Sequence, residues 1–241
     1  MSKTLHPISV CHWQETGSVV TFAFELEGSI EYQAGQYVNL KVTGVDDPRG
    51  PSRPFTLSSS PTEGSRLAIT MRMTNSSFKT RLTEISERGA LGELKMRGPM
   101  GDFKLHGARA AVMITGGIGI TPFRSMLRCA ADRGCDLQVV LLYSNSTPLE
   151  IAFKRELDDL ARQWRRLKII YTITRLEKAK TWAGKTGRID TDLIQEHAGA
   201  LDTPLYYVCG SPTMVNDIGR LLKDELNIAA EDVRTEKFTG Y

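Results

Sequence analysis

The sequence predicts two structural units, an antiparallel β-sheet or barrel followed by a doubly wound α/β sheet. The chain has 241 residues, which suits one large or two smaller domains at roughly 100–200 residues per domain. Before Leu105, short segments rich in β-branched and aromatic residues are separated by Gly, Pro, Asp and Ser, whereas after it apolar strands alternate with helical patterns. We therefore expect the units at residues 1–106 and 107–241, with the boundary at His106–Arg109.

The first unit is predicted to consist mainly of strands. Turn-forming stretches such as GVDDPRGPS and SPTEGS separate the candidate strands, as is typical of antiparallel sheets. One helix interrupts them, because Phe78, Leu82 and Ile85 are spaced to share a face and Ser76 or Ser77 can cap the helix start. The expected strands are 18–24, 36–42, 53–57 and 66–73.

The second unit is predicted to alternate strands and helices. Ala110–Thr115 is an uninterrupted apolar run, as expected of a parallel strand that is covered on both faces. Repeated strand–helix alternation predicts a parallel sheet with helices on both sides. The expected strands are 110–115, 137–143, 167–173 and 205–209, and the expected helices are 122–131, 149–164 and 214–226.

The composition excludes several classes of function. With 41% hydrophobic and 24% charged residues the chain is an ordinary globular protein, and its net charge of +3 is too small and too dispersed to indicate nucleic-acid binding. No apolar run approaches the roughly 20 residues that span a bilayer, and the first residues lack the apolar region of a secretory signal. The four cysteines lack the spacing of zinc or iron–sulfur sites. We therefore expect a cytoplasmic protein with no metal, no nucleic-acid partner and no membrane span.

The strongest local signal is a glycine-rich turn, ITGGIGITPF at Ile114–Phe123. A buried strand ends at Thr115, three glycines follow, and Pro122 suits the first turn of a helix. Glycines let the backbone approach an anion, and a helix N-terminus offers free N–H groups. The pattern indicates a diphosphate site. A tight turn without a ligand is the alternative, because the spacing is not the common G-x-G-x-x-G.

A second junction also leads from a strand through a glycine-containing turn into a helix. Tyr206–Met214 contains a strand, a Gly-Ser turn and a proline at a helix start. In a doubly wound sheet both turns lie at the carboxyl edge, where ligands bind, so together they favour a dinucleotide. Cys209 is either a small buried residue or a group beside the reactive centre.

In order along the chain, the motifs resemble those of the ferredoxin–NADP reductase superfamily over nearly the full length of the sequence. Arg53-Pro-Phe-Thr-Leu-Ser-Ser-Ser-Pro is similar to the flavin signature of this family, and Gly98-Pro-Met-Gly-Asp-Phe to its link between domains. Gly116-Gly-Ile-Gly-Ile-Thr-Pro and Cys209-Gly-Ser-Pro-Thr-Met resemble its two nucleotide loops, and Glu236-Lys-Phe-Thr-Gly-Tyr an end found in some bacterial members. The resemblance implies a flavin-binding antiparallel Greek-key β-barrel followed by an NAD(P)-binding α/β domain.

The resemblance also implies which residues bind FAD, with FMN as the alternative. Arg53 would neutralise the diphosphate, Phe55 would pack on the isoalloxazine ring, and Thr56 would hydrogen-bond flavin N5. The family usually has Tyr and Ser in place of Phe55 and Thr56. A surface arginine, a core aromatic residue and an ordinary strand threonine are the alternatives. The other expected flavin contacts are Pro54, Ser59, Ser76, Ser77, Lys79, Thr80, Phe238 and Tyr241.

The nicotinamide nucleotide is expected on the second unit. Glu236 is expected as a proton or charge partner beside the flavin, although its distance from the chain end differs from the plant-type pattern. Arg175 resembles the phosphate-binding arginine of some NADPH users, with a solvated basic loop as the alternative, so the choice between NADH and NADPH stays open. The expected nucleotide contacts are Thr115, Gly116, Gly117, Gly119, Thr121, Cys209, Gly210, Ser211, Pro212 and Met214, and the expected catalytic residues are Thr56, Cys209 and Glu236.

The resemblance therefore implies a flavin-dependent oxidoreductase that takes hydride from NAD(P)H. Such an enzyme works mainly by positioning two cofactors, because the flavin carries the difficult chemistry. Its electrons would pass to a ferredoxin, a flavodoxin or an oxygenase component. Two alternatives remain, a reductase of free flavins or ferric chelates and a non-catalytic flavin-carrying subunit of a larger complex.

Overall fold

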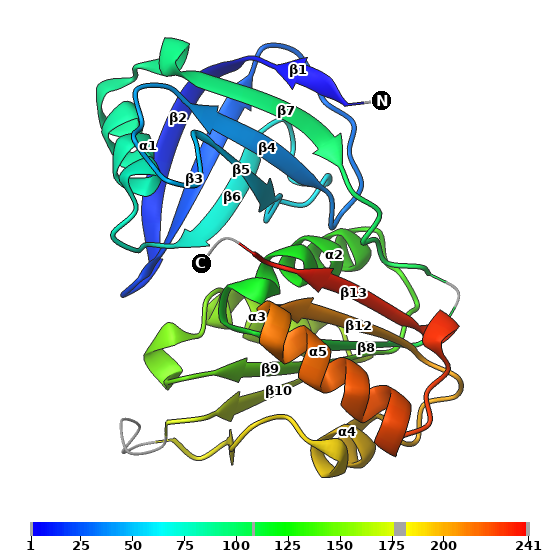
Figure 1. Cartoon of the computed structure of the whole chain (residues 1–241). Coiled ribbons are helices and arrows are strands. Elements are labelled where there is room, and N and C mark those ends of the chain that lie inside the picture. Colours follow the sequence, from blue (N-terminus) through cyan, green and yellow to red (C-terminus); the bar gives the residue numbers. More distant parts are fainter. Residues whose placement is uncertain (1, 108, 176–181, 240–241) are drawn as a thin grey trace.

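The computed structural model describes residues 2–107, 109–175 and 182–239. Figure 1 shows two units stacked on each other, a β-barrel formed by the first part of the chain and an α/β unit formed by the second. The predicted fold class is confirmed: the first unit is built from antiparallel sheets and the second from a parallel sheet. No helix in the described ranges is long and apolar enough to cross a membrane.

The barrel combines a four-stranded sheet in the order β1-β7-β4-β5 with a three-stranded sheet in the order β2-β3-β6. Phe22, Phe24, Leu40 and Ile69 are buried between the two sheets. Helix α1 (Ser77–Arg88) packs its predicted apolar face against this core. The strands are β1 (Lys3–Leu5), β2 (Pro7–Thr16), β3 (Val19–Leu26), β4 (Tyr37–Val42), β5 (Ser52–Thr56), β6 (Leu67–Arg72) and β7 (Leu94–Met100).

The α/β unit has a six-stranded parallel sheet in the order β11-β10-β9-β8-β12-β13. Successive residues of β8 point to opposite faces, so Met113 joins the core under α2 and α3 while Ile114 joins the core under α4 and α5. The strands are β8 (Ala111–Gly116), β9 (Val139–Asn145), β10 (Leu167–Ile173), β11 (Lys185–Thr186), β12 (Leu205–Gly210) and β13 (Val233–Lys237). The helices are α2 (Ile120–Asp132), α3 (Lys154–Gln163), α4 (Thr191–Ala198) and α5 (Pro212–Arg220).

The helices of the α/β unit differ from the sequence prediction. Helix α4 (Thr191–Ala198) was not predicted, and α2 spans Ile120–Asp132 in place of 122–131. The helix expected at 149–164 begins only at Lys154, because Pro148–Glu150 forms a separate 3-10 turn and Phe153 has a positive φ of 58°. The helix expected at 214–226 starts earlier, at Pro212, and its last turn at Leu221–Glu225 widens into a π-helix.

The two units meet along a close-packed seam. The link that follows β7 places Phe103 against Phe123 and Tyr207, with ring centroids 5.7 and 5.9 Å apart. At Gly35, whose φ is +97°, an added Cβ would lie 2.0 Å from the carbonyl oxygen of Phe103 and 2.5 Å from the Cε of Met126. Glycine is therefore required there by both backbone conformation and space, and it lets the barrel touch the link and helix α2.

Candidate functional site

A cavity of about 460 Å³ lies where the barrel meets the α/β unit. Its walls come from β5, β6 and the start of α1 in the barrel, from the glycine turn before α2, and from β13. In Figure 1 the end of β13 points toward the barrel, which brings the two units together at this place. The cavity unites these predicted site residues: Arg53, Pro54, Phe55, Thr56, Ser76, Lys79, Thr121, Glu236 and Phe238.

One part of the cavity is apolar and aromatic. Phe55 and Phe78 pack with their ring centroids 5.9 Å apart, and Met71 lines the same region. Thr56 is buried on β5 and pairs in register with Tyr37 of β4, which also lines the cavity. Sequence reasoning missed Tyr37, because only the β4–β5 register reveals that it neighbours the flavin motif. This region can hold a flat aromatic ring system.

The adjoining part of the cavity is cationic, with the Arg53 guanidinium 5.2 Å from the centroid of the Phe78 ring. The Arg53 guanidinium donates from Nη1 to the carbonyls of Arg49, Gly50 and Ser52 at 2.6–2.8 Å. Its Nη2 donates to Asp47 Oδ1 at 2.6 Å.

The acidic side chain of Asp47 does not line the cavity, but it accepts hydrogen bonds from two residues that do, Arg53 and Ser76. Ser76 stands at the N-cap position of α1, but its hydroxyl donates to Asp47 at 3.2 Å and makes no cap bond. A backbone N–H bond from Arg49 contributes most to lowering the pKa of Asp47. Arg53 and Ser76 thus present donors to an anion, as a phosphate would require.

Lys79 adds a second cation to the polar end. Its side chain is buried and donates to the carbonyl of Arg72 at 2.6 Å and to the hydroxyl of Thr74 at 3.2 Å. Burial, followed by the neighbouring Arg49, Arg53 and Arg72, lowers the pKa of Lys79. A group of cations held this close together is best stabilised by an anionic ligand such as a diphosphate.

Three barrel residues that were expected at the flavin lie outside the cavity. The hydroxyl of Ser59 bonds with Tyr32 Oη and accepts from the N–H of Ala68, both at 2.9 Å. The hydroxyl of Ser77 donates to the carbonyl of Asp46 at 2.8 Å. Thr80 is exposed and does not line the cavity. Their roles in flavin binding stay predictions.

The two glycine turns lie side by side at the carboxyl edge of the sheet. Thr115 and Cys209 are register partners in the adjacent strands β8 and β12. A Cβ on Gly119 would lie 2.7 Å from the carbonyl oxygen of Cys209 and from Thr115 Oγ1, and a Cβ on Gly116 would lie 2.7 Å from Met214 Sδ. The glycines therefore allow direct backbone packing between the turns. Thr115 Oγ1 is buried and makes no hydrogen bond within the described residues.

Arg72 is a residue that sequence reasoning missed. It ends β6 of the barrel, yet its Nη2 would lie 3.6 Å from a Cβ on Gly117 in the α/β unit. Gly117 has a positive φ of 53°, so its N–H and carbonyl are presented in a way that side-chain-bearing residues rarely adopt. A cation of one unit thus lies over the glycine turn of the other, and no local pattern in the sequence signals this contact.

The turn that follows β12 caps the N-terminus of helix α5. Ser211 accepts a hydrogen bond from the N–H of Met214 at 3.3 Å, and Pro212 occupies the first turn of the helix. Cys209 is fully buried, and burial followed by the charge of Glu236 raises its pKa well above the usual value. The thiol therefore stays protonated and uncharged.

Strand β13 brings Glu236 and Phe238 to the cavity. Glu236 is the register partner of Cys209, and the N–H of Phe238 donates to the carbonyl of Gly210 at 2.8 Å. Burial raises the pKa of Glu236 to about 7, so this carboxyl can exchange a proton near neutral pH. Tyr241, also expected here, lies outside the described residues.

Arg175 lies away from the cavity. It is exposed beyond the end of β10, where its N–H donates to the carbonyl of Ser146 at 3.0 Å. Lys178 and Lys180, which follow it, are outside the described residues. Within those residues, no group of three or more His, Cys, Asp or Glu side chains is arranged to hold a metal ion.

Comparison with protein families finds a match within the second unit. Residues 113–220 match the family described as "Oxidoreductase NAD-binding domain". The chain is 38% identical over 111 residues to a nitrate reductase [NADPH] of Emericella nidulans, covering 44% of this chain and 12% of that protein. It is 29% identical over 133 residues to ferredoxin–NADP reductase B of Sorangium cellulosum, covering 53% and 54%.

A longer but weaker match is found in an oxygenase system. The reductase component 2 of a terephthalate 1,2-dioxygenase from Comamonas is 25% identical over 208 residues, covering 86% of this chain and 60% of that protein. The chain thus matches only part of the length of each of these relatives, from 12% to 60%.

Solved structures share the complete two-unit fold. The cytochrome P450 reductase GcoB of Amycolatopsis matches with a TM-score of 0.79 at 21% identity, covering 99% of this chain and 71% of that one. A ferredoxin NADP+ reductase from Neisseria gonorrhoeae, solved with bound FAD and NADP, matches with a TM-score of 0.74 at 20% identity, covering 98% of both chains. At this level of identity the likeness concerns the fold.

Proposed function

We propose that the chain belongs to the ferredoxin–NADP reductase superfamily. It would be a flavin-dependent oxidoreductase that takes hydride from NAD(P)H onto bound FAD and passes electrons to a redox protein. The observation that carries this proposal is the single cavity that joins an aromatic slot, a cationic end and the glycine turn. Bound flavin would supply the hydride and single-electron chemistry that amino acid side chains lack.

The barrel residues fit the binding of FAD. Phe55 and Phe78 offer an apolar surface for the ring system, and the buried hydroxyl of Thr56 lies on the same wall. Arg53 and Lys79 would bind the diphosphate at the cationic end. The carboxylate of Asp47, itself an anion, accepts hydrogen bonds from Arg53 and Ser76. These contacts support the assignment of that end of the cavity to phosphate.

The α/β unit fits the binding of NAD(P)H. The open backbone of Gly117 and the guanidinium of Arg72 would hold the nucleotide diphosphate between the two units. The packed turn around Gly119 and Cys209 would form the floor beneath the nicotinamide, and the protonated thiol of Cys209 adds no charge there. Glu236 would hold or release a proton at its carboxyl beside this floor.

A ferredoxin, a flavodoxin or an oxygenase component is proposed as the electron acceptor. The relatives named as a ferredoxin–NADP reductase and as a reductase component of a dioxygenase support this class of partner. Reduction of each candidate by the purified chain and NAD(P)H would identify which one is used.

The decisive experiment is an absorption spectrum of the purified protein, before and after addition of FAD or FMN, followed by anaerobic titration with NADH and with NADPH. We expect a protein-bound flavin spectrum that one or both nucleotides bleach. A protein that binds neither flavin would refute the proposal. A bound flavin that neither nucleotide reduces would instead identify a non-catalytic carrier, and flavin that dissociates and is consumed at each turnover would identify a free-flavin reductase.

A further inference from the structure

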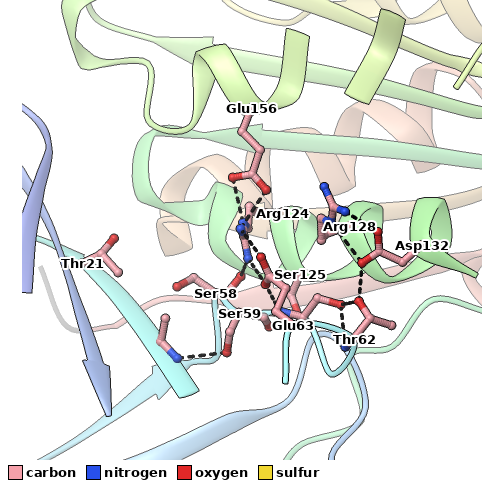
Figure 2. Close-up of polar contacts among 12 residues, drawn as sticks. Thr21, Ser58, Ser59, Thr62, Glu63, Arg124, Ser125, Arg128, Asp132 and Glu156 are labelled. Carbon is pink, nitrogen blue, oxygen red and sulfur yellow. Dashed lines mark hydrogen bonds and ion pairs between the residues drawn. The ribbon is translucent and has the colours of Figure 1, made fainter. Parts of the chain in front are cut away.

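A buried arginine joins the two units on a face that does not contribute to the flavin cavity. Arg124 lies on α2 with its side chain only 14% exposed, and Figure 2 shows it between carboxylates from both units. It donates from Nη1 to the carbonyl of Ser58 at 2.9 Å and from Nη2 to Glu63 Oε1 at 2.7 Å, both in the barrel. On the α/β side its Nε donates to Glu156 of α3 at 3.0 Å. These four residues are called the Arg124 cluster below.

Two neighbouring features hold the Arg124 cluster in place. The hydroxyl of Ser125, fully buried, donates to the carbonyl of Ser59 at 2.6 Å, which is a second bond from α2 to the barrel loop. The ring of Phe153 lies 5.7 Å from the Arg124 guanidinium, and Phe153 has a positive φ of 58°. A bulky residue adopts this backbone conformation only where its surroundings enforce it, so the contact with Arg124 is held against local strain.

The cluster connects the two chain segments that form the cofactor site. Ser58 follows Thr56 of the flavin motif by two residues, and Arg124 follows Thr121 by three residues on the helix that begins at the glycine turn. Both Thr56 and Thr121 line the cavity. A shift between Ser58 and Arg124 would therefore move two residues that line the site, one from each unit.

Removing the Arg124 charge would create repulsion at the seam. Glu63 and Glu156 approach the same guanidinium from opposite units. Without it, the two carboxylates would keep only the more distant charge of Arg128, which is already paired with Asp132. A partly buried carboxylate that loses its partner is strongly unfavourable. The simplest relief is separation of the barrel loop from α2 and α3, which changes the angle between the units.

We propose that Arg124 is a positioning residue for hydride transfer: it fixes the barrel against the α/β unit so that the two cofactor half-sites face each other at reacting distance. This inference rests on the proposed function. A displacement of about 1 Å at the reacting atoms lowers a rate by about 100-fold, so a small change of angle is sufficient. The affinity for FAD depends much less on that angle, because the proposed FAD contacts Phe55, Arg53 and Lys79 all lie on the barrel.

The test compares Arg124→Gln and Arg124→Lys with the control Arg162→Gln. Arg162 lies on α3, is 74% exposed and pairs with Asp159 of its own helix. The two exposed cysteines, Cys11 on the barrel and Cys135 on the α/β unit, carry spin labels, while the other two cysteines are buried. Pulsed electron paramagnetic resonance gives the distance distribution between the labels. Stopped-flow absorbance of the FAD-loaded, unlabelled protein gives the flavin reduction rate and the NAD(P)H concentration at half saturation.

We expect Arg124→Gln to broaden the label distance distribution and to lower the limiting reduction rate by about 10- to 100-fold. The affinity for FAD should stay within about twofold of wild type. The half-saturating nucleotide concentration, which depends on Arg72 and Gly117 of the two units, should rise by less than the limiting rate falls. Arg124→Lys, which keeps the charge but not the fork of donors, should show a smaller loss of rate. If Arg124→Gln does not fold, Arg124→Lys tests the inference by the same criteria. Arg162→Gln should match wild type in every measurement.

An unchanged label distribution or an unchanged limiting rate would overturn the inference. So would parallel losses of rate, nucleotide affinity and FAD affinity, because they would indicate general damage to the fold. If wild-type flavin is not reduced by either nucleotide, the proposed function fails, whereas the label distances still decide whether Arg124 sets the angle between the units.

Discussion

The packing between the two glycine turns predicts a sharp penalty for a single methyl group at Gly119. In Gly119→Ala the new Cβ would lie 2.7 Å from the carbonyl oxygen of Cys209 and from Thr115 Oγ1, and 2.9 Å from the Cα of Gly210. Two of these atoms belong to the backbone of β12 and cannot rotate away. Overpacking of this kind costs about 1–3 kcal/mol. At roughly 2–4 °C per kcal/mol for a chain of this size, the melting temperature should fall by about 2–12 °C.

Two matched glycine variants separate crowding from other effects. Gly219→Ala lies in helix α5 with no atom within 4 Å of the new Cβ, and it should stabilise the protein by about 0.5–1 kcal/mol. Gly117→Ala meets only Arg72 Nη2 at 3.6 Å but has a φ of +53°, so it should lose about 1–2 kcal/mol through backbone strain alone. Urea unfolding and thermal melts of the three variants measure these differences.

The assay also has a functional part. Because Gly119→Ala must push the two turns apart, NAD(P)H should bind more weakly while the affinity for FAD changes little. A Gly119→Ala protein that is as stable as wild type and binds the nucleotide as tightly would refute the contact between the turns.

Three further outcomes follow from the site. Burial raises the pKa of Glu236 to about 7 from its usual value of 4.5, so between these two pH values the folded state keeps a proton that the unfolded chain has lost. The free energy of unfolding should therefore fall as pH rises from 4.5 to 7. Glu236→Gln should flatten this pH dependence in urea unfolding, and an unchanged slope would contradict the assignment. Iodoacetamide at neutral pH should label Cys11 and Cys135 but not the buried Cys209, whose pKa burial raises, and a Cys209 adduct in the mass spectrum would show that the turn opens. Arg72→Ala should weaken NAD(P)H binding by about 10- to 100-fold. This is the loss expected when a charge-assisted hydrogen bond of about 1.5–3 kcal/mol is removed. An unchanged dissociation constant in a fluorescence titration would place the diphosphate elsewhere.

Much of the fold could be predicted because its signals are local. The apolar runs that become β8 and β9 need no distant partner to be recognised, since both of their faces are covered in a parallel sheet. Strand β13 was missed for the opposite reason. Val233–Lys237 is an edge strand with one apolar residue and four polar ones, and only its pairing with β12 makes it a strand.

The residues of the candidate site also differ in whether their signals are local in the sequence. Arg53, Phe55 and the glycine turn are visible as motifs, because each motif is continuous in the sequence. Asp47 and Arg72 were missed, since their importance depends on which residues stand opposite them in space. Arg124 was missed although it directly follows the glycine motif, because its partners Ser58 and Glu63 come from the other unit.

The walls of the cavity come from segments that are far apart along the chain, with Arg53 and Lys79 on one side and Glu236 and Phe238 on the other. Contacts between such distant segments are slow to form during folding, because the intervening loop must be closed before they stabilise it. A chain in which only the barrel has folded therefore offers an incomplete pocket. Flavin capture during refolding should therefore begin once the barrel has folded and become tighter when β13 completes the wall.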